Sequence, residues 1–195
     1  MAFIGRPTPT VRHIGRVAHD LGLAGLLGGN LFGRLALHPS VTEISDARER
    51  GKLVNAAWRR YGTVNSLSLA AVALGWGATR GEECPGGRLS PGQRRLAMAR
   101  DALVGLVAVT GIAAAVAGVR FSRILPGGAV PLADGDHAAP GAPEAARKVK
   151  RELRVLGLVG MVCEAALVGV NAELAEQRRH TRKRRPALPL LPSVR

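Results

Sequence analysis

The sequence predicts an all-α protein, a four-helix transmembrane bundle whose helices extend beyond the bilayer. Two observations predict this class. First, 47% of the 195 residues are apolar although 22% are charged and the net charge is +14, so the apolar residues must gather in blocks if the chain folds. Second, four apolar stretches approach the ~20 residues that a helix needs to cross the hydrocarbon core. They are residues 17–37, 61–79, 102–119 and 155–174.

The first stretch, residues 17–37, is the least apolar of the four because polar side chains and glycines interrupt it. A basic segment precedes it, which also fits a cleaved signal peptide. However, the sequence RLALHPS follows Gly33 where the small residues of a cleavage site would have to stand. We therefore expect the stretch to remain as a span. Four spans place both termini on the same side of the membrane.

The later stretches carry clearer helix signals. Ser90 and Pro91 have the order of an N-cap and a first helical residue, so the third helix should begin there and continue into the span at 102–119. Pro143 likewise precedes a charged segment that leads into the fourth span. Before the second span, Ser40 and Glu43 have capping-box spacing.

Two aromatic residues, Trp58 and Tyr61, stand at the start of the second span. Aromatic side chains at this position are typical of the belt that anchors a helix at the membrane interface.

The four spans belong to one domain, residues 1–177. Residues 81–87 and 126–143 are rich in glycine and proline and are predicted to be irregular. Residues 178–195 are basic and rich in proline, and we expect them to form a disordered C-terminal tail.

The orientation of the bundle is predicted from the distribution of its basic residues. Loops on the side of the termini carry 15 Lys and Arg residues, against 13 on the other side. The densest basic cluster directly follows the last span, where it would contact anionic phospholipid of the cytoplasmic leaflet. We therefore predict a multi-pass protein of the bacterial plasma membrane with cytoplasmic termini. The headgroup-contacting residues are Arg178, Arg179, Arg182, Lys183, Arg184 and Arg185.

A glycine stripe is the most specific pattern of the first span. Gly25, Gly29 and Gly33 recur every fourth residue, and Gly22 falls on the same helix face. Small residues in such a stripe let another helix approach closely within lipid. A phosphate-binding glycine loop is excluded, because the spacing matches no known phosphate motif and no strand precedes it.

Glu164 lies close to the centre of the fourth span. A carboxyl group at that depth is costly unless it is protonated or paired, so it should face neighbouring helices. Asn171 lies on the same small and polar stripe of this helix. One interpretation is a packing hydrogen bond and the other is a proton relay or ligand site. The candidate bonding partners are Asn30, Ser66, Ser68 and Thr110.

A second polar set should form at the membrane face that the termini share. His19 and Asp20 begin the first span, and Arg100 and Asp101 begin the third. Together they would make a titrating pocket or an ion site, since histidine changes charge near neutral pH. The alternative is a solvated rim of interfacial charges.

Several chemistries are excluded by residue type and spacing. Cys84 and Cys163 are the two cysteines, too few for a disulfide framework or a cysteine zinc site. His19 and His38 are too far apart along one helix for a bis-histidine haem. The segment from Asp134 to His137 is too short for a metal loop. Aromatic residues make up 3%, which gives no stacking platform for nucleic acid. We predict no metal, no cofactor and no nucleic-acid partner.

Three motifs carry a family resemblance: His19-Asp20-Leu21-Gly22, the pair Gly28-Gly29, and Leu37-His38-Pro39. With them the chain resembles small four-helix integral membrane proteins of unknown function from high-GC bacteria, chiefly over its first two spans. In topology it is similar, more distantly, to DoxX-like and anthrone-oxygenase-like membrane proteins. The resemblance implies a membrane location and the four-span fold, and no catalytic residue is carried over from it.

From these patterns we expect a non-enzymatic accessory or scaffold subunit in a homo-oligomer or a larger membrane complex. One alternative is a small transporter or proton-conducting subunit that uses Glu164. Another is a membrane-bound enzyme acting on a lipophilic substrate, which would need polar groups converging on a cavity.

Overall fold

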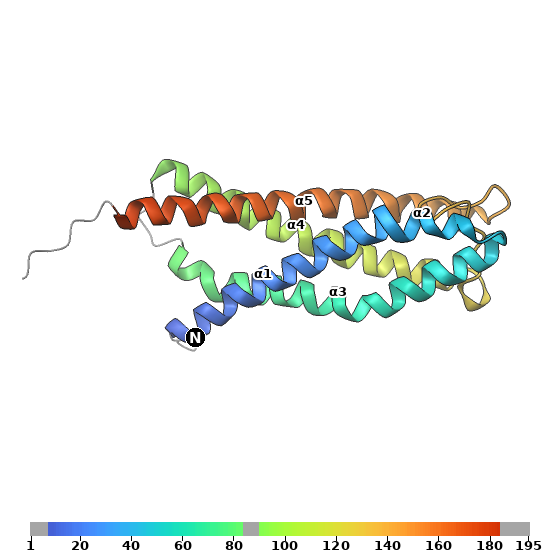
Figure 1. The fold of residues 1–195 in the computed structure, drawn as a ribbon, viewed down its shortest axis with the longest axis horizontal. Helices are drawn as coiled ribbons and strands as arrows, with labels where there is room; N and C mark the ends of the chain where they lie inside the picture. Colours follow the sequence, from blue (N-terminus) through green and yellow to red (C-terminus); the bar gives the residue numbers. More distant parts are fainter. Residues whose placement is uncertain (1–7, 84–89, 184–195) are drawn as a thin grey trace, which may run out of the picture.

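Four long helices build the protein. The structure is a computed structural model that describes residues 8–83 and 90–183. Helices α1 (Pro9–Phe32), α3 (Ala47–Glu83), α4 (Pro91–Ser122) and α5 (Glu144–Lys183) run along one long axis in alternating directions (Figure 1). The predicted all-α, four-helix class is thus confirmed. At 1.5 Å per residue, the 37 residues of α3 extend about 55 Å, well beyond the ~30 Å hydrocarbon core of a bilayer.

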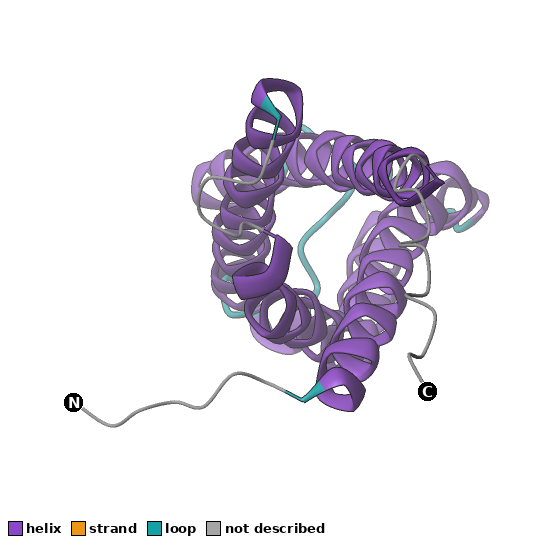
Figure 2. Cartoon of the chain, turned by 90° about the vertical axis from the view of Figure 1, so that its left-hand side faces the viewer, coloured by secondary structure: helices purple, strands orange, loops and turns teal. Residues whose placement is uncertain are grey.

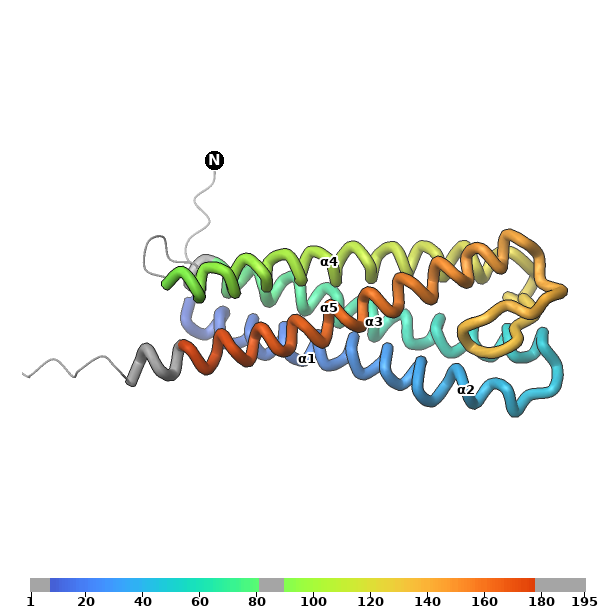
Figure 3. The backbone as a smooth tube through the Cα atoms, turned by 90° about the horizontal axis from the view of Figure 1, so that it is seen from above, coloured from blue at the N-terminus to red at the C-terminus, as the bar shows by residue number. Residues whose placement is uncertain are grey.

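The helices pack as a four-sided ring. Helix α1 lies mainly against α3, and α4 mainly against α5. Lighter contacts of α1 with α5 and of α3 with α4 complete the ring, as the view along the axis shows (Figure 2). Figure 3 shows that α1 begins and α5 ends at one end of the bundle, whereas the segments joining α1 to α3 and α4 to α5 share the other end. We call the latter the loop end.

The buried apolar side chains form two clusters. One lies midway along the bundle and joins all four helices through residues such as Leu23, Val72, Val107 and Leu167. The other lies at the loop end, where Phe121 packs with residues of the segment between α4 and α5. The loop end therefore has its own core.

Helix α4 begins as the sequence predicts. Ser90 is its N-cap and Pro91 its first residue, and Gln93 completes a capping box by accepting from the Ser90 backbone N–H. Pro143 directly precedes α5, also as expected.

The predicted capping box of Ser40 and Glu43 is wrong. Those residues continue the first helix, which passes through a π-helix (η1, Gly33–Leu37), a short α2 (His38–Ser40) and a 3-10 turn (η2, Val41–Glu43). Helix α3 starts later, where Asp46 Oδ1 accepts from the backbone N–H groups of Arg48 and Glu49 at 2.7 and 2.9 Å. An aspartate oxygen offers the same cap as serine.

The segment from 126 to 143 is irregular, as predicted, but it is closely packed. It contains a 3-10 turn (η3, Pro126–Gly128) and one isolated bridge between Leu132 and Ala138. Val130 and Leu132 are fully buried. Gly127 and Gly128 have φ of 65° and 69°, which glycine adopts without the strain of a side chain. The segment covers the loop end of the bundle.

Two of the helices, α4 and α5, are long and apolar enough to cross a membrane. In each, 22% of the most apolar 18-residue window is buried inside the protein, whereas the core helix of a water-soluble protein would be mostly buried. Helices α1 and α3 do not reach this apolarity, which agrees with the polar residues that interrupt them. Two helices could therefore span a membrane.

Helix α5 extends further than expected. The tail was predicted to begin at residue 178, but the helix continues to Lys183, because this segment is rich in residues of high helix propensity. The basic side chains from 178 onward lie outside the described part of the structure, and so do residues 184–195. Their contact with lipid stays a prediction.

Candidate functional site

The glycine stripe of α1 faces α3. A Cβ atom at Gly22 would lie 2.5 Å from the backbone oxygen of Ser68, and one at Gly25 would lie 2.5 Å from its hydroxyl. The rings of Tyr61 and Trp58 occupy the space beside Gly29 and Gly33, respectively. Gly22 therefore lies directly against the backbone of α3, whereas Gly29 and Gly33 make room for aromatic rings of that helix.

The aromatic pair on α3 packs against the glycine face of α1, and its place at a membrane interface stays a prediction. Tyr61 donates to the Gly25 carbonyl at 2.6 Å, and Trp58 lies edge-on to Tyr61 with ring centroids 6.2 Å apart. Both side chains are half-buried. The glycine face of α1 leaves room for flat rings, so the rings pack inward.

Glu164 is paired with Asn30 inside the bundle. Its side chain is 4% exposed, and the Asn30 amide donates to both carboxylate oxygens, at 3.0 and 2.9 Å. Among the predicted alternatives, the Thr110 hydroxyl donates instead to the Leu106 carbonyl of its own helix, at 2.7 Å. The contact joins α1 to α5 across 134 residues of sequence.

Asn171 is not part of this pair. It lies two turns further along α5 and is half-buried, and within the described residues it makes no side-chain hydrogen bond. Its position on the polar stripe therefore does not bring it into contact with the carboxyl group of Glu164.

The four residues predicted at the end of the termini lie in two separate settings. On α1, buried His19 has its Nδ1 3.2 Å from Asp20. On α4, Asp101 accepts from Trp76 Nε1 at 2.7 Å and from Arg80 Nε at 3.1 Å. Arg100 is buried beside Asp101, with its NH2 group 3.7 Å from that carboxylate. Asp101 thus ties α4 to α3.

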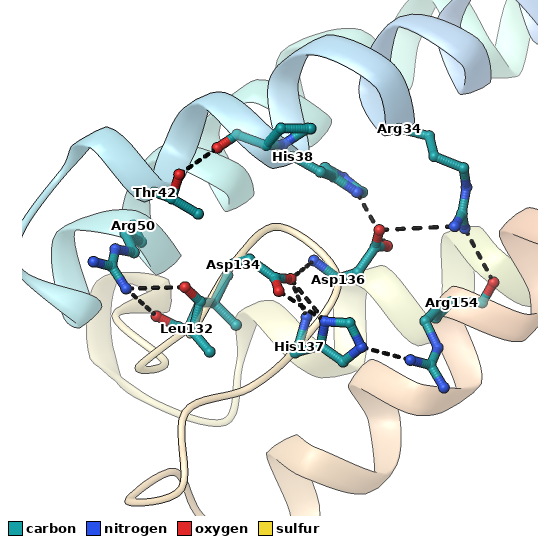
Figure 4. A network of polar contacts seen from close by, with 11 residues as sticks. Arg34, His38, Thr42, Arg50, Leu132, Asp134, Asp136, His137 and Arg154 are labelled. Atoms are coloured by element: carbon teal, nitrogen blue, oxygen red, sulfur yellow. Dashed lines mark hydrogen bonds and ion pairs between the residues drawn. The ribbon is translucent and has the colours of Figure 1, made fainter.

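The densest polar group was missed by sequence reasoning and lies at the loop end. We call Arg34, His38, Trp58, Asp136 and Lys150 the loop-end cluster. His38 Nδ1 lies 3.1 Å from Asp136 Oδ1, and Arg34 NH1 lies 3.7 Å from Oδ2 of the same carboxylate (Figure 4). The backbone N–H of Gly135 donates to the His38 carbonyl at 3.2 Å. The 126–143 segment is thereby fastened to the first helix.

The tautomer of His38 follows from its partners. Trp58 Nε1 donates to His38 Nε2 at 3.1 Å, and an accepting nitrogen carries no proton. The neutral ring therefore holds its proton on Nδ1, toward Asp136. Burial lowers the pKa of His38 below its usual value, although the Asp136 carboxylate acts in the opposite direction. His38 is accordingly a neutral imidazole clamped between an indole and a carboxylate.

A second layer surrounds Asp136. His137 Nδ1 lies 2.8 Å from Asp134, and Arg154 NH1 lies 2.6 Å from His137 Nε2 (Figure 4). Burial raises the pKa of Asp134, but hydrogen bonds from His137 and from backbone N–H groups outweigh it, so the pKa lies below its usual value. Arg34 also donates to the Arg154 carbonyl at 3.4 Å. This layer links the segment to α5.

Lys150 completes the cluster. It is 6% exposed, and its ammonium lies 5.4 Å from the centroid of the Phe121 ring. Burial lowers its pKa from 10.5 to about 8, while the charges of Asp136 and Asp134 act against that shift.

The π-helix explains why the first helix reaches this cluster. The His38 N–H bonds to the Gly33 carbonyl, five residues back, which widens the helix by one residue per turn. Such π-bulges are frequent at functional sites. Asn30, Arg34 and His38 follow one another at four-residue spacing, so one side of the first helix carries a row of polar side chains from the Glu164 pair to the loop end.

The polar contacts of this arrangement join helices to one another and to the covering 126–143 segment. Within residues 8–80 and 90–177, no group of three or more His, Cys, Asp or Glu side chains could hold a metal ion. Asp136 of the loop-end cluster is paired with His38 and Arg34, and Asp134 beside it is paired with His137. No family model, no curated protein and no solved structure matches this chain. The resemblance in the sequence therefore rests on its motifs alone.

Proposed function

We propose that the chain is an integral membrane protein whose four long helices all span the bilayer, and that it serves as a non-enzymatic accessory or scaffold subunit. One observation carries the membrane part: apolar side chains point outward on every helix. Leu21, Leu74, Val109 and Val162, one from each helix, are 68%, 74%, 66% and 63% exposed. In water each would forgo roughly 1.5–3 kcal/mol of burial, whereas lipid removes that cost.

The packing supports four spans rather than two. Helix α3 lies against α4, and α1 lies against α5, along a shared axis (Figure 1). If α4 and α5 cross the bilayer, their neighbours lie at the same depth. Two of the polar residues that lower the apolarity of α1 face the interior: His19 is buried and Asn30 pairs with Glu164, so neither meets lipid.

Single cysteines in an otherwise cysteine-free chain test the spans. With a membrane-impermeant maleimide, Arg59→Cys at the loop end and Arg94→Cys at the opposite end should label from opposite sides of the membrane. Leu67→Cys on α3 and Val109→Cys on α4 should not label in intact vesicles. Labelling of Leu67→Cys with protection of Val109→Cys would leave two spans and contradict the four-span proposal.

The same variants test orientation. We place both termini in the cytoplasm of a bacterial cell, on the narrow excess of basic residues at that end. In intact spheroplasts, Arg59→Cys should then label at once and Arg94→Cys only after the membrane is permeabilised. The reverse order would invert the topology.

The scaffold role is supported by where the polar side chains are used. Asn30 with Glu164, Trp76 with Asp101, and His38 with Asp136 each join two elements. Glu164→Leu should weaken the packing of α1 against α5 in the purified protein in micelles. The matched control Glu173→Leu, at an exposed position of α5, should not. In proteoliposomes with a pH-sensitive dye, the wild-type chain should leak protons no faster than empty vesicles.

Proton conduction is the second candidate, and the row of polar side chains along the first helix favours it. From Glu164 and Asn30 the row continues through Arg34 to Asp136 and His38 at the loop end. A proton leak of the wild-type chain that Glu164→Gln abolishes, with assembly intact, would replace the scaffold proposal by this one.

A further inference from the structure

A depression with two arginines lies where α4 ends beside the start of α5. It is open to the surroundings, has a volume of about 320 Å³, and is lined by Arg120, Arg123, Ile124, Ala145 and Val149. Two cationic side chains thus stand beside an apolar floor, to which α5 contributes Ala145 and Val149 and the segment after α4 contributes Ile124.

The depression stands at the edge of the apolar surface. Val116 and Val119 are exposed on α4, and Arg120 and Arg123 follow them directly. At 1.5 Å per residue, Arg123 lies about 6 Å beyond Val119 along the axis. That distance matches the headgroup layer, which adds roughly 5–7 Å to each side of the hydrocarbon core.

The charges at the depression are mostly uncompensated. Within the described residues, the guanidinium of Arg123 has neither an ion pair nor a hydrogen bond. Arg120 NH1 lies 3.6 Å from Glu152, and both of these side chains are largely exposed. An exposed pair of this kind contributes little, so Arg120 can exchange the carboxylate for a stronger partner.

We propose that this depression binds the phosphate of an anionic phospholipid, with Arg120 and Arg123 as its ligands and the apolar floor against the glycerol backbone. Guanidinium groups match the geometry of phosphate oxygens. The apolar half of the lining favours a lipid over a free anion. The site lies at the loop end, far along the bundle from the basic tail predicted from the sequence, and the inference rests on the proposed membrane insertion.

Native mass spectrometry of the full chain tests the site, using micelles doped with equal amounts of phosphatidylglycerol and phosphatidylcholine. The wild-type chain should retain phosphatidylglycerol preferentially. Arg120→Gln and Arg123→Gln should each reduce that preference by about fivefold. Arg59→Gln removes the same charge from an exposed arginine of α3 at the same end and should retain the preference. Melting temperatures of the variants show that all of them fold.

Two outcomes would overturn the inference. If the double variant Arg120→Gln/Arg123→Gln retains phosphatidylglycerol as well as the wild-type chain does, then the depression is not the lipid-binding site. If inorganic phosphate, which has no acyl chain, displaces the phosphatidylglycerol, then the ligand of the depression is a soluble anion and not a lipid. Flotation with pure phosphatidylcholine vesicles separates this test from the proposed function, since insertion there does not depend on anionic lipid. A chain that fails to float contradicts membrane insertion itself.

Discussion

Replacing Gly22 with alanine adds one methyl group where α1 lies directly against the backbone of α3. The new Cβ would lie 2.5 Å from the Ser68 backbone oxygen and 3.1 Å from the Val72 nitrogen. Neither atom can rotate away, because both belong to the backbone of a helix. Gly28 on the same helix is the matched control, since a Cβ there meets nothing within 4 Å.

The two variants should differ in the free energy of unfolding. Alanine is favoured over glycine inside a helix by roughly 0.5–1 kcal/mol, and this gain applies to both. At Gly22 the helices must also move apart, and overpacking of this kind costs about 1–3 kcal/mol. Gly22→Ala should therefore be destabilising by about 1–2 kcal/mol, whereas Gly28→Ala should be neutral or slightly stabilising.

Thermal unfolding in detergent micelles, followed by circular dichroism at the helical band, measures the difference. For a chain of this length each kcal/mol shifts the melting temperature by roughly 2–4 °C. Gly22→Ala should melt at least about 3 °C below Gly28→Ala. A Gly22→Ala variant that melts at or above Gly28→Ala would falsify the close approach of α1 and α3.

Three further predictions concern the loop end. Because burial lowers the pKa of His38 in the folded state, the free energy of unfolding should be at its full value above pH 6.5 and should fall as the pH drops below 6.5. This fall should be smaller in His38→Asn than in the exposed control His13→Asn, and equal falls in the two variants would contradict the prediction. The pKa of Lys150 is about 8 in the folded state, so between pH 8 and 10.5 the Lys150 amine is protonated in the unfolded chain and neutral in the folded one. The free energy of unfolding should therefore rise over this range, and Lys150→Met should abolish that rise in denaturant titrations. Hydrogen bonds from backbone N–H groups lower the pKa of Asp46, so the cap should weaken as the pH falls below 3.8; Asp46→Ala should melt lower than Asp46→Asn, which keeps the cap, and equal melting temperatures would count against it.

The glycine stripe and the caps illustrate what a sequence pattern can predict. A four-residue glycine period identifies the face on which helices can approach, because side-chain size is a local property. Ser90 and Gln93 could be recognised for the same reason, since a capping box closes within four residues. The pattern could not identify α3 as the partner of that face.

The packing of the aromatic residues and of the 126–143 segment could not be predicted from the sequence, for a physical reason. In a membrane helix both the outward and the inward faces are apolar, so apolar periodicity does not tell which way Trp58 and Tyr61 point. Glycine and proline predict only that the segment around Asp136 is irregular. Its order comes from His38, 98 residues earlier in the sequence, and from Arg34.

The sequence by itself determined that four long helices form, that one of them begins at Ser90 and Pro91, and that a carboxyl group stands near the middle of the fourth. Those properties depend on propensity, capping and apolarity, which act over a few neighbouring residues. Only the tertiary structure decided that Glu164 meets Asn30 and that His38 meets Asp136. Such pairs depend on how far each helix is rotated and shifted along its axis, and the packing of whole helix faces sets both at once.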